Sequence, residues 1–184
     1  AFWINAYNAL TFQTILEAGV PASIRDIKPD PWENARWDVA GRSVSLNWIE
    51  HKRLREQLRE PRVHFVLVCA ARGCPALPNR AILPEGLDAQ LDRATRAFFQ
   101  DASRNRVDRA GKTVHLSRIL DWYGSDFEGL EGVKVLPGLE NLSAKEAAVI
   151  SYMARHLSES DRAVLGQGGI TVVYNEYDWT LNRR

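Results

Sequence analysis

The sequence predicts an α+β fold, a single domain in which helices pack on a small, mostly antiparallel sheet. Two segments, 2–18 and 87–100, repeat apolar residues at helical spacing. The run 63–69 is β-branched and almost wholly apolar, which is typical of a strand covered on both faces. Two further segments, 37–45 and 105–116, alternate on either side of a glycine, as β-hairpins do.

Composition excludes several classes of protein. With 184 residues, 45% hydrophobic and 26% charged, the chain is long and apolar enough to bury a core, so disorder and coiled coil fit poorly. The formal net charge of +1 gives no overall field that would draw the chain to nucleic acid. The longest apolar run, 63–71, is far shorter than the roughly 20 residues of a transmembrane helix. We therefore expect no nucleic-acid partner and no transmembrane segment here.

The N-terminal half contains two expected helices and one expected hairpin. The helix 2–18 is followed by Gly19, which supplies a stop. The hairpin turns at Gly41, and Ser45 then begins a helix that runs to about Arg59. The polar residues of this second helix therefore follow the hairpin closely in the sequence.

The run 63–69 is expected to be the central strand, and the loop 70–78 follows it. Gly73, Pro75 and Pro78 break regular structure in this loop. Loops at strand ends commonly hold functional sites, so this loop is the first place to look for one.

The C-terminal half is expected to alternate short helices and strands. After the amphipathic helix 87–100, the predicted elements are a hairpin of strands 105–108 and 113–116, a helix from Ser117 through Trp122, a helix begun by the capping box of Ser143 and Glu146 and ending near Leu157, and a last strand 170–174.

Cys74 is the best single candidate for chemistry, because it lies between Gly73 and Pro75 in the loop. Proline suits the first turn of a helix, and a helix N-terminus there would stabilise a thiolate and an oxyanion. A structural role for this cysteine is the alternative reading. Cys69 ends the expected strand, where cysteine usually packs as a small hydrophobe. A disulfide between the two would close a tight loop in an oxidising compartment and would block a nucleophile.

A thiol nucleophile needs an imidazole within reach to take its proton. His51 follows Glu50 on a predicted helix, and His64 begins the strand that leads to Cys74. Read alone, His64 is a core histidine, His51 is a surface residue, and His115 is part of a hairpin. No pair of histidines or cysteines has the spacing of a metal site, and we expect neither a metal nor a cofactor.

Three polar residues are further candidates. Asn5 and Asn8 share one face of an otherwise apolar helix, so each must find a hydrogen-bond partner if buried. They either tie the helix to a neighbouring loop or help to orient the histidine and bind substrate. Arg72 can hold a substrate carboxylate through paired hydrogen bonds, or it can simply be solvated.

Five fragments in order resemble one family. They are Phe2-Trp-Ile-Asn-Ala-Tyr-Asn-Ala-Leu-Thr, Ser45-Leu-Asn-Trp-Ile-Glu-His, Val63-His-Phe-Val-Leu-Val-Cys-Ala-Ala-Arg-Gly-Cys-Pro-Ala-Leu, Leu116-Ser-Arg-Ile-Leu-Asp-Trp-Tyr and Tyr177-Asp-Trp-Thr-Leu-Asn. Together they are similar to the DUF547 family, and the resemblance covers most of residues 1–184. The chain differs from the commoner Cys-Pro-Pro of that family in having Ala76 after Pro75.

The resemblance implies a bacterial, exported and therefore periplasmic protein, with a likeness to papain-like and transglutaminase-like cysteine enzymes. It implies Cys74 as nucleophile, His51 as base and Glu50 or Asn5 as the group that orients the base. Because the histidine precedes the cysteine here, the resemblance further implies a circularly permuted connectivity or the use of His115 as base.

Two hypotheses follow from these observations. The first is a cysteine-dependent hydrolase or acyl transferase that acts on a peptide-like amide, in a small molecule or a polypeptide. The second is a noncatalytic binding or scaffold domain in which the same polar residues hold helices together. The apolar start without an initiator Met leads us to expect a domain trimmed at its N-terminus.

Overall fold

The computed structural model describes residues 1–183, and its chain divides into two compact units. Unit 1 comprises Ala1–Ala94 together with the C-terminal segment from Asp178, and unit 2 comprises Thr95–Tyr177. All of the cysteines and all of the site residues proposed from the sequence, other than the alternative base His115, belong to unit 1.

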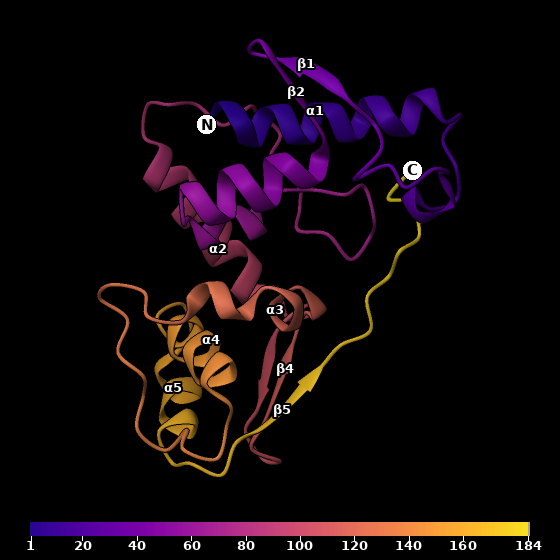
Figure 1. Ribbon diagram of the computed structural model, residues 1–184. Coiled ribbons are helices and arrows are strands. Elements are labelled where there is room, and N and C mark those ends of the chain that lie inside the picture. Colours follow the sequence, from indigo (N-terminus) through magenta and orange to yellow (C-terminus); the bar gives the residue numbers. More distant parts are fainter. Residues whose placement is uncertain (184) are drawn as a thin grey trace. The chain divides into compact units, whose positions relative to one another are not determined.

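Unit 1 is mainly helical and carries one hairpin (Figure 1). Its elements in chain order are helix α1 (Phe2–Glu17), the 3₁₀ turn η1 (Ile24–Asp26), strands β1 (Trp37–Val39) and β2 (Arg42–Val44), the π-helix η2 (Trp48–Gln57), the 3₁₀ helix η3 (Pro61–Phe65) and the first part of helix α2 (Leu87–Gln100).

Helix α1 confirms the prediction for residues 2–18, including its stop. Gly19 takes a φ of +74°, and its N–H donates to the carbonyl of Leu16, while the N–H of Val20 donates to that of Ile15. This is the Schellman arrangement, in which a glycine in the left-handed region lets two terminal carbonyls find donors. The predicted hairpin is also confirmed, since β1 and β2 pair antiparallel across Ala40 and Gly41.

The second predicted helix forms as η2, a π-helix. Near its start the Ser45 hydroxyl accepts the N–H of Trp48 at 3.1 Å, and at its end the N–H of Leu58 donates to the carbonyl of Arg53, five residues earlier. Extended π-helices are rare, and shorter π segments occur frequently at functional sites. Glu50 and His51 both lie in its first half.

The prediction of a central strand at 63–69 is wrong, although the predicted burial on both faces is correct. Residues up to Phe65 form η3, a 3₁₀ helix that begins at Pro61, and residues 66–69 belong to no helix or strand. The side-chain amide of Asn8 bonds the backbone there instead, donating to the Val66 carbonyl and accepting from the Val68 N–H. The side-chain amide of an asparagine in helix α1 thus makes the two backbone hydrogen bonds that a neighbouring strand would make.

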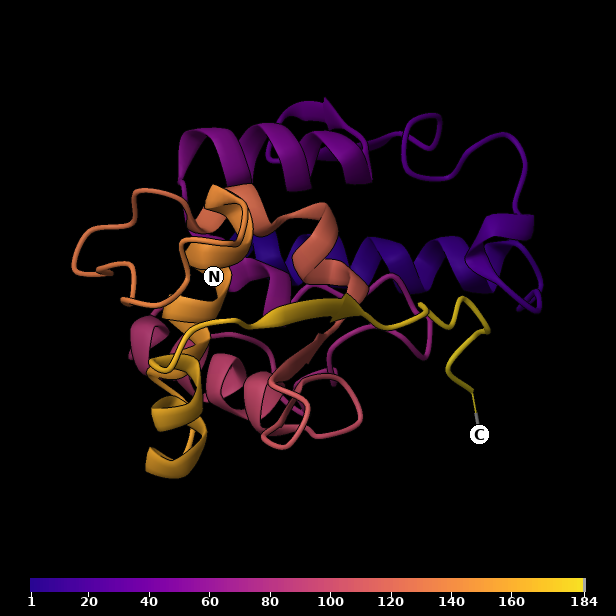
Figure 2. The ribbon, with the colours of Figure 1, turned by 90° about the horizontal axis from the view of Figure 1, so that it is seen from below.

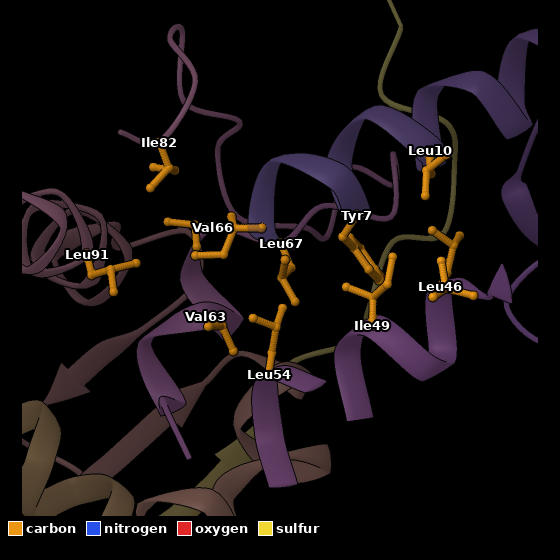
Figure 3. Packing of buried hydrophobic residues seen from close by; sticks show 12 residues of the cluster. Tyr7, Leu10, Leu46, Ile49, Leu54, Val63, Val66, Leu67, Ile82 and Leu91 are labelled. Atoms are coloured by element: carbon orange, nitrogen blue, oxygen red, sulfur yellow. The ribbon is translucent and has the colours of Figure 1, made fainter. Parts of the chain in front are cut away.

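The core of unit 1 lies between α1, η2 and the segment 63–67. Figure 3 shows Tyr7 and Leu10 of α1 directed toward Ile49 of η2 and toward Leu46, which precedes it. Ile49 and Leu46 are fully buried. Burying a leucine or isoleucine stabilises a fold by about 1.5–3 kcal/mol, so this layer fixes η2 against α1 and with it the position of Glu50.

Unit 2 combines a three-stranded sheet with short helices. Strands β3 (Arg106–Asp108) and β4 (Thr113–Leu116) pair antiparallel, and β5 (Thr171–Tyr174) pairs parallel with β4, beside which it runs in Figure 2. The helices are α3 (Arg118–Trp122), the 3₁₀ helix η4 (Gly124–Phe127), α4 (Ala144–Ala154) and α5 (Glu159–Leu165).

The helix starts predicted in unit 2 are confirmed. Ser117 caps α3 by accepting the N–H of Ile119 at 3.4 Å. Ser143 accepts the N–H of Glu146 while the Glu146 carboxylate accepts the N–H of Ser143, which completes the capping box of α4. The sequence signals for the starts of these two helices were therefore reliable.

The fold class is α+β, with two small sheets that are mostly antiparallel rather than the single sheet predicted. The grouping of both units into one domain stays a prediction. Within residues 1–183, no helix has both the length and the apolar character needed to cross a membrane.

Candidate functional site

Two sulfur atoms meet in the loop that follows the 63–68 segment. Cys69 Sγ lies 2.8 Å from Cys74 Sγ, and the backbone N–H of Cys69 donates to Cys74 Sγ at 3.0 Å. The two cysteines are thiols, with no disulfide between them. Cys74 is buried, with 5% of its surface exposed, and Cys69 is half-buried. The sulfur of Cys74 therefore receives one backbone donor and lies against a second thiol.

The loop is held in this shape by the C-terminal segment of unit 1. The N–H of Arg72 donates to the carbonyl of Thr180, and the N–H of Gly73 donates to that of Asp178, both at 2.9 Å. Ala70 adopts a φ of +62°, a left-handed conformation that L residues rarely take. Backbone strain of this kind costs about 1–3 kcal/mol and is often found at functional sites.

The expected helix N-terminus at Pro75 is absent, because residues 75–80 adopt no helix. Pro75 is buried and lies outside any helix, so a helix macrodipole does not act on Cys74 from that side. The sequence predicted that a helix N-terminus would donate to the sulfur of Cys74. The N–H of Cys69, five residues earlier in the chain, is the donor instead. The hydrogen-bond donor to the sulfur of Cys74 therefore differs from the one predicted, and the chemical role of the loop stays a prediction.

Glu50 is buried, with 7% of its surface exposed, and its Oε2 accepts a hydrogen bond from the Tyr7 hydroxyl at 2.8 Å. A buried carboxylate needs a donor of this kind, because an unpaired charge in the interior is costly. Tyr7 comes from α1 and Glu50 from η2, so this bond joins the two helices beside the packed core. Tyr7 was not among the site residues predicted from the sequence.

His51 is held by its neighbour one turn later on η2. The Arg55 guanidinium lies 2.7 Å from His51 Nδ1. Because a guanidinium only donates, Nδ1 accepts, and a neutral ring then carries its proton on Nε2. A base in a catalytic triad has the opposite tautomer, with Nδ1 protonated toward a carboxylate. Residues four apart on a helix are neighbours, so the spacing of His51 and Arg55 was the available signal for this contact.

Asn5 and Asn8 each use both ends of the side-chain amide on the backbone. Asn5 donates to the Ile82 carbonyl at 2.8 Å and accepts from the Ile82 N–H at 2.9 Å. Asn8 makes the same kind of pair with the carbonyl of Val66 and the N–H of Val68. These contacts are those expected if the two residues tie α1 to neighbouring loops.

Arg72 is exposed in the loop between Cys69 and Cys74. Hydrogen bonds from Thr180 lower the pKa of Asp178, and the charge of Arg72 lowers it further. The arginine that was proposed to bind substrate thus interacts electrostatically with an acidic residue of the segment that supports the loop.

The remaining histidines named from the sequence lie in different units. His64 is buried in η3, with 4% of its surface exposed, in agreement with its reading as a core histidine. His115, the alternative base, lies on β4 in unit 2, opposite Arg106 on β3. Among residues 1–183, no group of three or more histidine, cysteine or acidic side chains is placed to hold a metal ion.

The sequence did not predict that the contact between Cys69 and Cys74 would lie at the centre of the candidate site. The spacing of five residues across Gly73 was visible, but the positive φ at Ala70 and the support from the C-terminal segment were not. These two features turn the chain back on itself and bring the sulfurs together.

Comparison with known proteins gives a single result. The family model described as "Protein of unknown function, DUF547" matches residues 1–99, which contain the candidate residues of α1, η2 and the cysteine loop. No curated protein and no solved structure matches the chain, so the expected likeness to papain-like enzymes has no support from these comparisons. The model match spans more than half of the 184 residues. The chain belongs to the DUF547 family.

Proposed function

We propose that the chain is a cysteine-dependent hydrolase or acyl transferase that acts on a peptide-like amide, with Cys74 as the nucleophile. The observation that carries the proposal is the hydrogen bond from the Cys69 N–H to Cys74 Sγ at 3.0 Å. The expectation of an exported, periplasmic protein belongs to the same proposal and rests on the family resemblance.

A donor aimed at a cysteine sulfur favours the thiolate, which is the reactive form. Burial acts in the opposite sense, because it penalises the charged form. At Cys74 the backbone donor and the adjacent Cys69 thiol both face the sulfur, and the second lies at 2.8 Å. Two donors at contact distance offset the cost of burial, so the geometry favours the charged sulfur.

In the proposed reaction the Cys74 thiolate attacks the carbonyl carbon of the amide and forms a carbon–sulfur bond. The carbon–nitrogen bond then breaks, and the leaving amine takes a proton from the base. Water, or a second amine for transfer, later releases the acyl group from the sulfur. The thiol proton that the base first removed is the one that the amine receives.

His51 is the base in this proposal. In the observed arrangement Arg55 occupies Nδ1 of His51, so the ring carries its proton on the nitrogen that a base would use to accept one. His51 therefore acts as a base only after Arg55 leaves Nδ1 and the ring proton moves there. Glu50 positions η2 through Tyr7, which accounts for its burial without placing it on the imidazole.

The proposal is tested by the rate at which iodoacetamide alkylates Cys74 as a function of pH. Trypsin cuts after Arg62, Arg72 and Arg80, so Cys69 and Cys74 fall in separate peptides and are quantified independently. We expect half-maximal alkylation of Cys74 below the ordinary thiol pKa of about 8.5. A midpoint at or above that value would refute the proposal, because burial alone raises it. Cys74→Ser is the control for the assignment of the peptide.

A noncatalytic scaffold domain is the second candidate, and the amides of Asn5 and Asn8 favour it. Both amides bond only backbone groups of unit 1 in the contacts described above, which is the behaviour of structural residues. Under this reading Cys74→Ser leaves every ligand interaction and cellular phenotype unchanged. A phenotype of Cys74→Ser in a protein that still folds would count against it.

A further inference from the structure

The two cysteines of unit 1 are arranged for direct reaction with each other. Their sulfur atoms lie 2.8 Å apart, and sulfurs joined in a disulfide lie about 2.05 Å apart. Bond formation therefore needs only a small shift of two side chains. The four residues between them form a short loop, so the reacting groups are neighbours in sequence as well as in space.

The backbone of the loop is already folded for that shift. The N–H of Cys74 donates to the carbonyl of Ala71 at 3.1 Å, which closes a turn inside the loop. The C-terminal segment adds hydrogen bonds from outside, including one from the N–H of Asn182 to the carbonyl of Ala70 at 2.7 Å. The entropic cost of bringing the cysteines together has thus been met by folding, and proximity of this kind strongly favours an intramolecular reaction.

Access to the two sulfurs differs. Cys69 is half-buried, whereas only 5% of Cys74 is exposed. An external reagent therefore reaches Cys69 more easily, and Cys74 is the neighbour that can respond from inside the loop.

We propose that Cys69 and Cys74 form a reversible disulfide by exchange with a small-molecule disulfide, and that this bond withdraws Cys74 from reaction. The formation of the disulfide stands independently of the proposed hydrolase function, whereas its effect on catalysis rests on that function. In an oxidising compartment the disulfide is the resting form, and a reducing thiol releases the nucleophile.

The exchange has two balanced steps. Cys69 as its thiolate attacks one sulfur of the small disulfide, forms a mixed disulfide and releases one small thiolate. Cys74 as its thiolate then attacks Cys69 Sγ, forms the Cys69–Cys74 bond and releases the second small thiolate. The protein loses two electrons and two protons, and the small disulfide gains them as two thiols.

The experiment uses the whole chain incubated with oxidised glutathione or with dithiothreitol, then denatured and treated with iodoacetamide. After reduction, both cysteines should be alkylated. After oxidation, the intact monomer should lose the mass of two hydrogen atoms and take up no alkyl group. Trypsin cuts after Arg72, so peptides 63–72 and 73–80 should be recovered as one linked species that separates on reduction.

Cys69→Ala and Cys74→Ala are matched controls, each checked for folding by circular dichroism. Each retains one cysteine and cannot close the bond. Cys74→Ala should keep one glutathione on Cys69 as a mixed disulfide, because the second attacking thiol is missing, whereas Cys69→Ala should take up glutathione more slowly, because Cys74 is buried. Wild-type protein that accumulates glutathione adducts, forms linked dimers or still takes two alkyl groups after oxidation would overturn the inference. A linked pair in a protein whose reduced Cys74 alkylates only around pH 8.5 or above would overturn the proposed function and leave this inference standing.

Discussion

Replacement of Asn8 by alanine gives the sharpest stability prediction, because both ends of its amide bond backbone groups of buried residues. Asn8 is 8% exposed, and its partners lie on Val66 and Val68, which are 0% and 4% exposed. Leaving a buried polar group unsatisfied costs about 1–3 kcal/mol, so two such groups cost about 2–6 kcal/mol. Alanine in place of asparagine returns up to about 0.7 kcal/mol in helix propensity. We expect a net loss of about 1.5–5 kcal/mol.

Asn5→Ala is the matched control, because it removes the same two kinds of hydrogen bond from the same helix. Asn5 itself is half-buried, although its partner Ile82 is only 5% exposed, so water that replaces the Asn5 side chain can reach the backbone groups of Ile82. The loss should then be the net value of two hydrogen bonds, about 1–3 kcal/mol, less the gain in propensity. The difference between the two variants isolates the effect of burial.

Urea unfolding followed by tryptophan fluorescence measures both losses, and it reports mainly on unit 1, which holds five of the six tryptophans. Hydrogen exchange at the Val68 amide adds a local readout, since its protection should fall in Asn8→Ala and not in Asn5→Ala. If Asn8→Ala proves no more destabilising than Asn5→Ala, then the amide does not replace a sheet partner and the reasoning is refuted.

Three further predictions concern single interactions. Tyr7→Phe removes the donor to buried Glu50 and should destabilise the fold by about 1.5–3 kcal/mol in urea, whereas an unchanged midpoint would show that the carboxylate does not depend on it. The hydrogen bond from Lys145 lowers the pKa of Asp121 from its usual 3.8, so this carboxyl stabilises the fold above that pH and the contribution is lost on acidification. Lys145→Met should therefore flatten the acid limb of the stability profile, and an unaltered limb would contradict this. Burial, followed by nearby acidic charges, raises the pKa of Tyr174 to about 12, so stability should fall as pH rises from 10 toward that value. Tyr174→Phe should abolish this loss in alkaline urea titrations, and a loss that persists would assign it to another group.

The regular elements were predictable where local chemistry determines them. Apolar periodicity and Gly19 defined α1, the Ala40–Gly41 turn defined the first hairpin, and Ser143 with Glu146 defined the start of α4. In each case the signal lies within a few residues of the element it controls. Such signals survive in any tertiary context that does not contradict them.

The strand expected at 63–69 failed because a distant residue decided its structure. The apolar pattern correctly predicted burial on both faces, but pattern alone does not reveal what satisfies the backbone. Pro61 began a 3₁₀ helix, and Asn8 supplied hydrogen bonds from nearly sixty positions earlier in the chain. The sequence also showed that Asn8 needed a partner without showing which one.

Most contacts of the candidate site could not be predicted from its residues. Cys74 was singled out as the residue on which chemistry would depend, which stays a prediction, and its expected donor was a helix end that does not form. Its actual donor, the Cys69 N–H, is positioned by a positive φ at Ala70 and by hydrogen bonds from the C-terminal segment. Neither is encoded by residue type at the loop itself. The contact between His51 and Arg55, by contrast, could be predicted from their spacing of four residues on a helix.

The proposed function depends on surroundings of Cys74 that favour the thiolate form of its sulfur. The most direct measurement is the ¹³C chemical shift of the Cys74 Cβ, followed as a function of pH in reduced, cysteine-labelled protein and assigned by its disappearance in Cys74→Ser. We expect this resonance to titrate below pH ~8.5, and we expect the Cys69→Ala variant, which keeps the backbone donor and loses the neighbouring thiol, to titrate between the wild type and that value. Titration of wild-type Cys74 at or above pH ~8.5 would show that burial outweighs the donors, and would refute the proposed function.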